Sequence, residues 1–339
     1  MTQDRRTGPL ADRPVLASLV ATIVAGIAVI VIAHVTGADA IGRAFDHIDV
    51  RLIPVVAAAE LITYPAYMLA FQSIAGIHGH AKLSLPVVAR VVVAGFGPFA
   101  LSGGFGIDKR ALEAIDEDER SARVRVMALG TLEWAVLAPI TCGVAIWLLV
   151  TGANILPSLL WPWATAVPIG LGFAFWAGGR PERLARIGGS YKDWVAQALE
   201  GVGVIRTLVR HPLRYWGAWV GTTLYWLADM GAFYASLRVF GLELGPGRVV
   251  IAYSTGYAAT RRSLPLGGAG VTEVLMTYAL YWVREPLAPA LAAVLIYRGF
   301  NFLLIAFPAL IANRQLKSTL RPSEPPPPEP ARPLDKRPT

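Results

Sequence analysis

Six long apolar runs constrain the fold of this chain more than any other feature of its sequence. The runs are 14–37, 52–76, 126–150, 156–178, 215–240 and 286–312. Each is long enough for a helix that crosses the hydrocarbon core of a bilayer, which takes about 20 residues. Two shorter apolar segments, 249–260 and 267–283, are candidates for further spans. Of the 339 residues, 55% are hydrophobic and only 16% are charged, unlike an average soluble domain. The sequence therefore predicts an all-α integral membrane protein with about eight transmembrane helices.

The positively charged residues predict how these helices are oriented. Lysine and arginine concentrate in the segments 1–13, 82–90, 109–125, 180–214 and 314–339. By the positive-inside rule these segments are cytoplasmic, so we expect both termini on the cytoplasmic side of the membrane. The net charge of +8 follows from this topology, and nucleic acid is not expected as a partner. The chain divides into a cytoplasmic tail (1–13), a polytopic membrane domain (14–313) and a proline-rich tail (314–339) that is expected to be disordered.

The basic segment 182–210 has the pattern of an amphipathic helix. Apolar residues recur there at helical spacing, and arginines and lysines fill other positions. Two interpretations remain open at this point. The segment is either an interfacial helix at the membrane surface or a cytoplasmic helical hairpin packed on the membrane domain.

Two glycine segments interrupt the apolar pattern at comparable places in the two halves of the chain. The first pair is Gly103 and Gly104, and the second is Gly267 and Gly268, followed by Gly270. Glycine loosens a helix and bares its backbone, which hydrocarbon penalises unless protein or water covers the gap. Broken helices at matching places in two halves usually mark a transport site. We therefore expect re-entrant or broken helices at both segments, and an internal repeat.

The segment 249–262 can be placed in the membrane in two ways. If it crosses inward and 267–283 crosses outward, the basic tail ends in the cytoplasm. If 249–262 is instead re-entrant from the outside, the tail ends outside. The lysines and arginines from Arg314 onward favour the first arrangement, which gives eight spans and one re-entrant segment at 86–107.

The glycine segments also predict where a lipid headgroup would bind. A helix that begins at 267–270 would aim free backbone N–H groups and a positive dipole end at a lipid phosphate. Basic side chains flank both segments and would add charge-assisted hydrogen bonds. The expected binding residues are Gly103, Gly104, Lys109, Arg110, Arg261, Arg262, Gly267, Gly268 and Gly270. The simpler alternative is that the glycines permit close helix packing and that the arginines mark the membrane edge.

Ionisable residues inside the apolar runs form a second candidate set. Such groups are unfavourable in hydrocarbon and usually serve a function. The residues expected to line or gate a cavity are Glu60, Glu133, Asp229, Glu273, Tyr297 and Arg298. Each charged one could instead be half of a structural ion pair, and Arg298 with Glu273 or with Asp229 is the obvious candidate.

Enzyme and metal signatures are absent from the sequence. Cys142 is the only cysteine, which excludes a disulfide or a multi-cysteine metal site within one chain. His78 and His80 have no further ligands near them in the sequence and are expected to be solvated. No catalytic residue, metal or cofactor is predicted.

The motifs resemble those of a known family. The segment from Leu264 to Glu273 resembles the Pro-x-Pro-Gly-Gly-x-Gly-x-x-Glu motif of the lysylphosphatidylglycerol synthase transmembrane-region family, the flippase part of bacterial phosphatidylglycerol lysyltransferases. The segment 98–110 is similar to the family's first glycine motif, and Tyr297-Arg298 to its late Tyr-Arg. The chain departs from the family at Leu266, where the motif has proline, at Trp134, which follows Glu133 where the family often has arginine, and at Thr272, the residue before Glu273. The likeness covers roughly 15–312, and the aminoacyl-transferase domain of the larger members is absent.

The resemblance implies a multi-pass lipid translocator of a bacterial plasma membrane, without lysyl-transfer activity. Its substrate would be an anionic or aminoacylated phospholipid, or a polyprenyl-linked lipid. The alternative is a non-transporting membrane scaffold that docks a glycosyltransferase or lipid synthase through the basic segment and the proline-rich tail. An intramembrane enzyme acting on a lipid phosphate would need paired acid and base residues, and spacing alone does not place such a pair.

Overall fold

The computed structural model describes most of the region predicted to lie in the membrane. The described residues are 23, 26–27, 30–31, 33–46, 48–77, 83–97, 104–116, 118–180, 184, 192–257, 268 and 270–319. The tail 1–13, most of the first apolar run and the tail beyond 319 lie outside them, as do His78 and His80. Every regular element within the described residues is helical, which confirms the all-α fold class.

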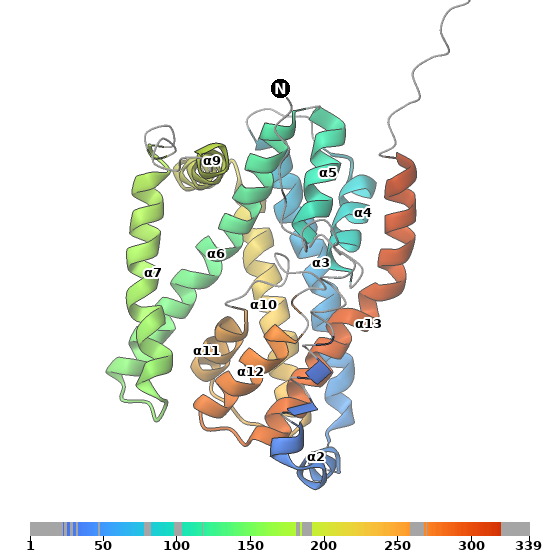
Figure 1. Ribbon diagram of the computed structural model, residues 1–339, viewed down its shortest axis with the longest axis vertical. Helices are drawn as coiled ribbons and strands as arrows, with labels where there is room; N and C mark the ends of the chain where they lie inside the picture. Colours follow the sequence, from blue (N-terminus) through green and yellow to red (C-terminus); the bar gives the residue numbers. More distant parts are fainter. Residues whose placement is uncertain are drawn as a thin grey trace, which may run out of the picture.

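The helices follow one another along the chain as Figure 1 shows. They are α2 (Ala38–Phe45), the 3-10 helix η1 (Val50–Leu52), α3 (Ile53–Ala75), α4 (Leu85–Phe96), α5 (Gly104–Asp116), α6 (Glu119–Val150), α7 (Pro157–Ala177), α9 (Lys192–Arg210), α10 (Trp216–Val239), α11 (Pro246–Gly256), α12 (Val271–Trp282) and α13 (Leu287–Thr319).

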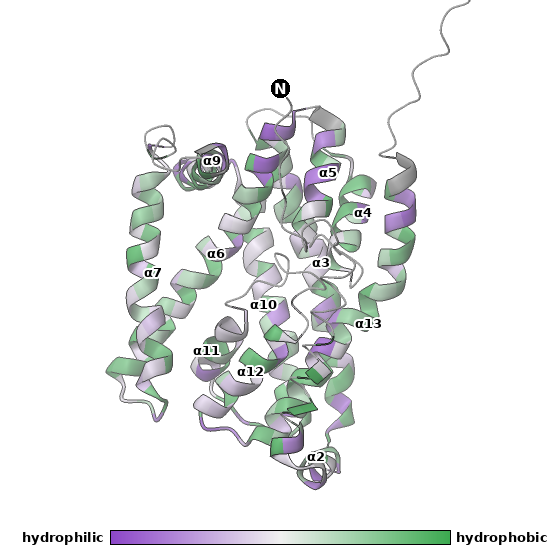
Figure 2. Cartoon of the chain, viewed as in Figure 1, coloured by the Kyte–Doolittle hydropathy of each residue, from purple (hydrophilic) through white to green (hydrophobic). Residues whose placement is uncertain are grey.

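Long apolar helices make up most of the molecule. Among the described residues, four helical stretches are long and apolar enough to cross a membrane: Val50–Ala75, Glu119–Val150, Pro157–Ala177 and Leu287–Leu316. Helix α10 has 24 residues and lies beside α3 at the centre (Figure 1). Large apolar side chains are exposed along α7, among them Ile169 and Phe173, and Figure 2 shows this helix as mostly hydrophobic. An apolar outer surface of this extent suits contact with lipid, so the chain is a membrane protein.

Two pairs of neighbouring helices are too short to cross a bilayer. Helices α4 and α5 have 12 and 13 residues, and α11 and α12 have 11 and 12. At 1.5 Å per residue each reaches about 16–20 Å, against a hydrocarbon core of about 30 Å. In Figure 1 the first pair lies at the end of the molecule where α6 begins. The second pair lies at the opposite end, where α10 ends and α13 begins.

This geometry corrects the predicted placement of 249–283. Helices α11 and α12 are each about half as long as a crossing requires, so the described residues do not form the two crossings expected for 249–262 and 267–283. Residues 258–262, which end the segment in both arrangements, lie outside the described residues. The two helices form one hairpin that leaves from the end where it began, so α13 still runs to the end of the molecule that carries α9 (Figure 1).

The order of contacts repeats between the two halves. Helix α3 packs against α10. The other contacts among eight of the helices come in matched pairs if α3, α4, α5 and α6 correspond to α10, α11, α12 and α13. Thus α4 contacts α13 as α11 contacts α6, and α6 contacts α10 as α13 contacts α3. Helices α3 and α10 run in opposite directions (Figure 1). This arrangement is that of an inverted repeat, and it agrees with the internal repeat that the glycine segments suggest.

Small residues bring α3 and α10 together at the centre of this repeat. A Cβ atom on Gly221 would lie 2.5 Å from the backbone N of Ala70 and 2.7 Å from the backbone O of Ala66. A Cβ atom on Gly217, one turn earlier, would meet the side chains of Ser73 and Leu69. Glycines four residues apart permit this close approach of two membrane helices. The α3–α10 contact therefore forms a tight central seam.

Helix α9 lies crosswise at the end of α6 and α7. It is seen end-on in Figure 1, whereas α6 and α7 are seen along their length. Gly201 contacts Met127 of α6, and the Arg206 guanidinium lies 5.0 Å from the ring centre of Phe175 on α7. Residues 192–210 are therefore one helix packed on the membrane helices.

Candidate functional site

Six polar side chains are buried in the interior of the helical bundle. They are Glu60 (α3), Glu133 (α6), Asp229 (α10), Glu273 (α12), Arg298 and Asn301 (α13), and their exposed fractions lie between 0% and 5%. We call this set the buried polar cluster. Polar groups buried in apolar surroundings are unfavourable unless they are hydrogen-bonded, so the partners of each side chain define the site.

An ion pair joins the start of α12 to α13. The Nε of Arg298 donates to Oε1 of Glu273 at 2.7 Å, and the two side chains are 2% and 7% exposed. Of the two pairings considered for Arg298, the structure therefore contains the one with Glu273. Asp229 accepts a hydrogen bond from the Tyr253 hydroxyl.

Backbone geometry explains why glycines occupy the second glycine segment. Gly268 and Gly270 have φ values of 71° and 87°, in the left-handed region that side chains other than glycine rarely adopt. The N–H of Gly270 donates to Oε2 of Glu273, as in a capping box. The turn therefore requires glycine at both positions, and Glu273 holds the start of α12 in place.

This cap changes the expected role of the α12 N-terminus. The sequence predicts that backbone N–H groups there are free for a lipid phosphate. In the structure the N–H of Gly270 is already bound to the carboxylate of Glu273. An anionic headgroup would have to displace that carboxylate to reach the same N–H.

Asn301 connects the ion pair to α3. Its Nδ2 donates to Oε2 of Glu60 at 2.7 Å, and its Oδ1 accepts from Arg298 at 3.5 Å and from the Tyr257 hydroxyl at 3.5 Å. The Tyr64 hydroxyl donates to Oε1 of Glu60 at 3.3 Å. Hydrogen bonds thus run without interruption from α12 through α13 to α3.

Sequence reasoning missed Asn301 because it searched the spans for ionisable residues. A usable signal was present, since Asn301 follows Arg298 by three residues and therefore lies on the same face of the helix. A neutral amide inside an apolar span also needs a hydrogen-bonding partner.

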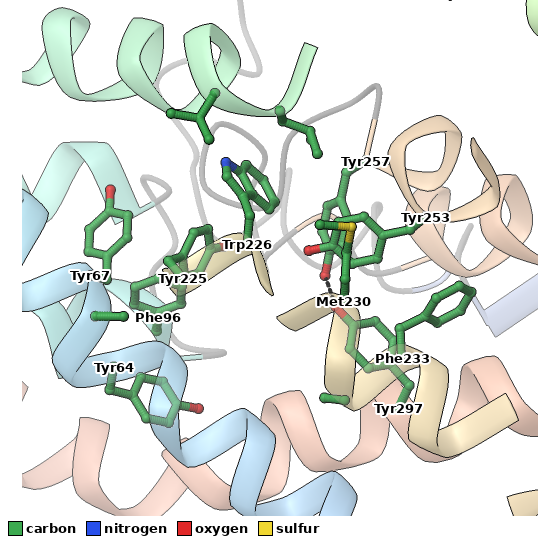
Figure 3. Packing of buried hydrophobic residues seen from close by; sticks show 14 of the residues in the cluster. Tyr64, Tyr67, Phe96, Tyr225, Trp226, Met230, Phe233, Tyr253, Tyr257 and Tyr297 are labelled. Carbon is green, nitrogen blue, oxygen red and sulfur yellow. Dashed lines mark hydrogen bonds between the residues drawn. The ribbon is translucent and has the colours of Figure 1, made fainter. Parts of the chain in front are cut away.

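Aromatic side chains surround the cluster. Figure 3 shows Tyr253, Tyr257 and Tyr297 grouped together, with Trp226 between this group and Tyr67. The hydroxyls of Tyr257 and Tyr297 lie 2.6 Å apart, so the predicted residue Tyr297 belongs to the same network.

Glu133 accepts hydrogen bonds from two aromatic side chains, Tyr67 and Trp226. The Tyr67 hydroxyl donates to Oε1 of Glu133 at 2.7 Å. The indole N–H of Trp226 donates to the backbone O of Glu133 at 2.9 Å, and the ring of Trp226 packs against Tyr253 and Tyr257. The aromatic side chains therefore link Glu133 to the rest of the cluster.

The cluster contains more negative than positive groups. It holds four carboxylates and one guanidinium among the residues that the structure describes. Across the same described residues, no three His, Cys, Asp or Glu side chains come close enough together to hold a metal ion.

The basic residues after the first glycine segment do not join the cluster. Gly104 is buried at the start of α5, but Lys109 lies five residues further on, about 8 Å along the helix. The Lys109 Nζ is 3.0 Å from Glu113 and 3.0 Å from Glu119. Arg110 is exposed, and its Nε donates to the backbone O of Gly106. Helix α5 thus carries both side chains away from the buried site.

Four predicted binding residues lie outside the described residues: Gly103, Arg261, Arg262 and Gly267. Their roles remain predictions.

Comparison with known proteins gives one result. The family model described as "Lysylphosphatidylglycerol synthase TM region" matches residues 122–309, which is more than half of the chain. The match spans α6 to α13 and includes every member of the buried polar cluster except Glu60. No curated protein and no solved structure matches the chain.

Proposed function

The chain belongs to the lysylphosphatidylglycerol synthase TM region family, and on this premise we propose that it moves the headgroup of a membrane lipid from one leaflet to the other. The observation that carries the proposal is the pair of short helical hairpins. They occupy opposite ends of the molecule, and the buried polar cluster includes Glu273 from the first turn of one of them.

Short hairpins suit translocation because each reaches about halfway across a bilayer. We assign both as re-entrant, α4–α5 from the cytoplasmic side and α11–α12 from the outside of a bacterial plasma membrane. Non-helical backbone at membrane depth is tolerated where protein or a water-filled path covers it. In transporters with inverted repeats, substrate sites lie near the midplane at such broken helices.

The cluster would act as the gate of this path. Its side chains are buried, so a headgroup reaches them only when the helices separate. Glu60 on α3 and Arg298 on α13 belong to different repeats, and Asn301 joins them. Breaking this connection would open the path between the repeats.

The charge of the cluster favours one of the candidate lipid classes. Four buried carboxylates attract a headgroup that carries an ammonium group, and the rings of Tyr253, Tyr257 and Trp226 offer cation–π contacts to it. An aminoacylated phospholipid has such a group, whereas a purely anionic lipid, or a polyprenyl-linked one without a free amino sugar, does not.

A fluorescence assay in liposomes tests the proposal. The purified protein is reconstituted with lysyl-phosphatidylglycerol labelled on its acyl chain with the fluorophore NBD, and dithionite is added to quench the outer leaflet. We expect quenching beyond the outer-leaflet share with the protein and none in protein-free liposomes. Labelled phosphatidylglycerol, which has no ammonium group, should move more slowly, and labelled phosphatidylcholine, which has a quaternary ammonium but no net charge, is the third probe.

Two outcomes would count against the proposal. Equal quenching with and without protein for all three probes would refute translocation. Unchanged quenching after Glu273→Ala and Arg298→Ala would remove these residues from the mechanism.

A scaffold that docks a glycosyltransferase or lipid synthase is the second candidate. One observation favours it: a polar cavity of about 420 Å³ lies between α6 and α9, lined by charged side chains that include Arg120, Arg123 and Asp193. A scaffold would retain a partner enzyme on purification, lose it after substitution of these residues, and move no lipid.

A further inference from the structure

Asn301 is the point where hydrogen bonds pass from one repeat to the other. Its amide has a fixed orientation, because Nδ2 faces the Glu60 carboxylate at 2.7 Å while Oδ1 faces two donors, Arg298 and the Tyr257 hydroxyl. The residue is 1% exposed. Asn301 therefore separates a guanidinium on its own helix from a carboxylate on α3.

Arg298 consequently has carboxylates on two sides. Glu273 on α12 is bonded to it directly at 2.7 Å, and Glu60 on α3 is reached through the amide of Asn301. A buried guanidinium is strongly unfavourable without a counter-charge. If the repeats shift against each other, Arg298 stays stable only by keeping Glu273 or by passing directly to another carboxylate.

We propose that Arg298 exchanges Glu273 for Glu60 during lipid translocation, and that Asn301 is the positioning residue that keeps Glu60 apart from Arg298 in the state described here. This rests on the proposed function, since the exchange is the gating step of lipid movement. The exchange keeps the guanidinium paired in both states. It also releases Glu273, whose carboxylate holds the first turn of α12 through the N–H of Gly270.

The test is a swap of the amide and the carboxylate. The double variant Glu60→Gln/Asn301→Asp rebuilds the hydrogen bond between α3 and α13 with its direction reversed, and it leaves the net charge unchanged. The carboxylate introduced on α13 by this swap still accepts from Arg298 and Tyr257. However, both carboxylates near Arg298 then belong to the second repeat, and α3 offers none at this position.

Thermal stability and the movement of NBD-labelled lysyl-phosphatidylglycerol are measured for the wild type, both single variants and the swap. Asn301→Asp alone should lower the unfolding temperature, because two carboxylates then face each other. The swap should recover most of this loss but move the lipid at least about tenfold more slowly than the wild type. Glu60→Gln alone should stay stable and be similarly slow. Ser236→Ala, which removes a buried hydrogen bond within α10, should keep the rate within about twofold.

Three results would overturn the proposal. If the swap moves lipid at the wild-type rate, the carboxylate need not be on α3. If the swap does not recover stability, the contact between Glu60 and Asn301 is not the one described. If the wild type moves none of the lipid probes, the proposed function fails and the exchange fails with it, and the wild-type sample alone shows this.

Discussion

Replacing Glu273 by glutamine should destabilise the protein far more than a surface substitution of the same kind. The carboxylate makes two buried contacts, one to Arg298 at 2.7 Å and one to the N–H of Gly270. Glutamine keeps the shape but loses the charge, and it leaves the guanidinium, 2% exposed, without this counter-charge. Breaking a buried ion pair by removing one partner costs about 3–5 kcal/mol.

A double-mutant cycle separates the ion pair from other effects. Arg298→Met should also destabilise by several kcal/mol, on the order of the same 3–5. The double variant Glu273→Gln/Arg298→Met should be less destabilised than the sum of the singles by at least about 1 kcal/mol, because neither charge is left unpaired.

Reversible unfolding in mixed detergent micelles, followed by tryptophan fluorescence, measures these free energies. Glu113→Gln is the matched control, because its pair with Lys109 is 27–31% exposed and should contribute less than about 1 kcal/mol. Additive effects of the two buried substitutions, within about 0.5 kcal/mol, would show that the ion pair does not form.

Three further substitutions give expected outcomes. Gly221→Val should prevent folding to a monodisperse protein on size-exclusion chromatography, because its Cβ would meet the backbone N of Ala70 at 2.5 Å; a well-folded variant would contradict the close seam. Arg284→Gly should raise the unfolding free energy by about 1 kcal/mol, since Arg284 has a φ of 78°; a lower value would contradict this. Burial raises the pKa of the Glu285 carboxyl against a smaller opposite effect of Arg248, so its ionisation disfavours the folded state as pH rises through the folded-state pKa. Glu285→Gln should therefore gain thermal stability relative to the wild type at neutral pH and lose that advantage at pH values below the ordinary range of glutamate; a pH-independent difference would refute the assignment.

The long helices could be predicted from hydropathy because their apolar runs exceed the length that a bilayer requires. The end points of α3, α7 and α10 lie within one or two residues of the apolar runs at 52–76, 156–178 and 215–240. Hydropathy could not show that 249–283 forms a hairpin, because two short apolar helices and two crossing helices have the same composition. The difference lies in where Gly256 and Trp282 end their helices.

The candidate site was only partly predictable, for a physical reason. Glu273 and Arg298 stand out in a sequence because charges are rare in apolar spans, and their pairing follows from the need for a counter-charge. Lys109 lies just as close to a glycine pair, yet the rise of α5 carries it to surface glutamates. Asn301 carries no charge, and only the packing of α13 against α3 shows its contact with Glu60.

Photo-crosslinking of a lipid headgroup tests the central claim most directly, namely that the hairpins and the buried polar cluster form the path of the headgroup. The protein in nanodiscs is irradiated with lysyl-phosphatidylglycerol that carries a diazirine in its headgroup, and adducts are located by mass spectrometry. We predict adducts on the segments around Tyr257, Glu273 and Asn301 that unlabelled lipid competes away. Adducts confined to outward-facing residues such as Ile169 and Phe173 of α7 would contradict the claim.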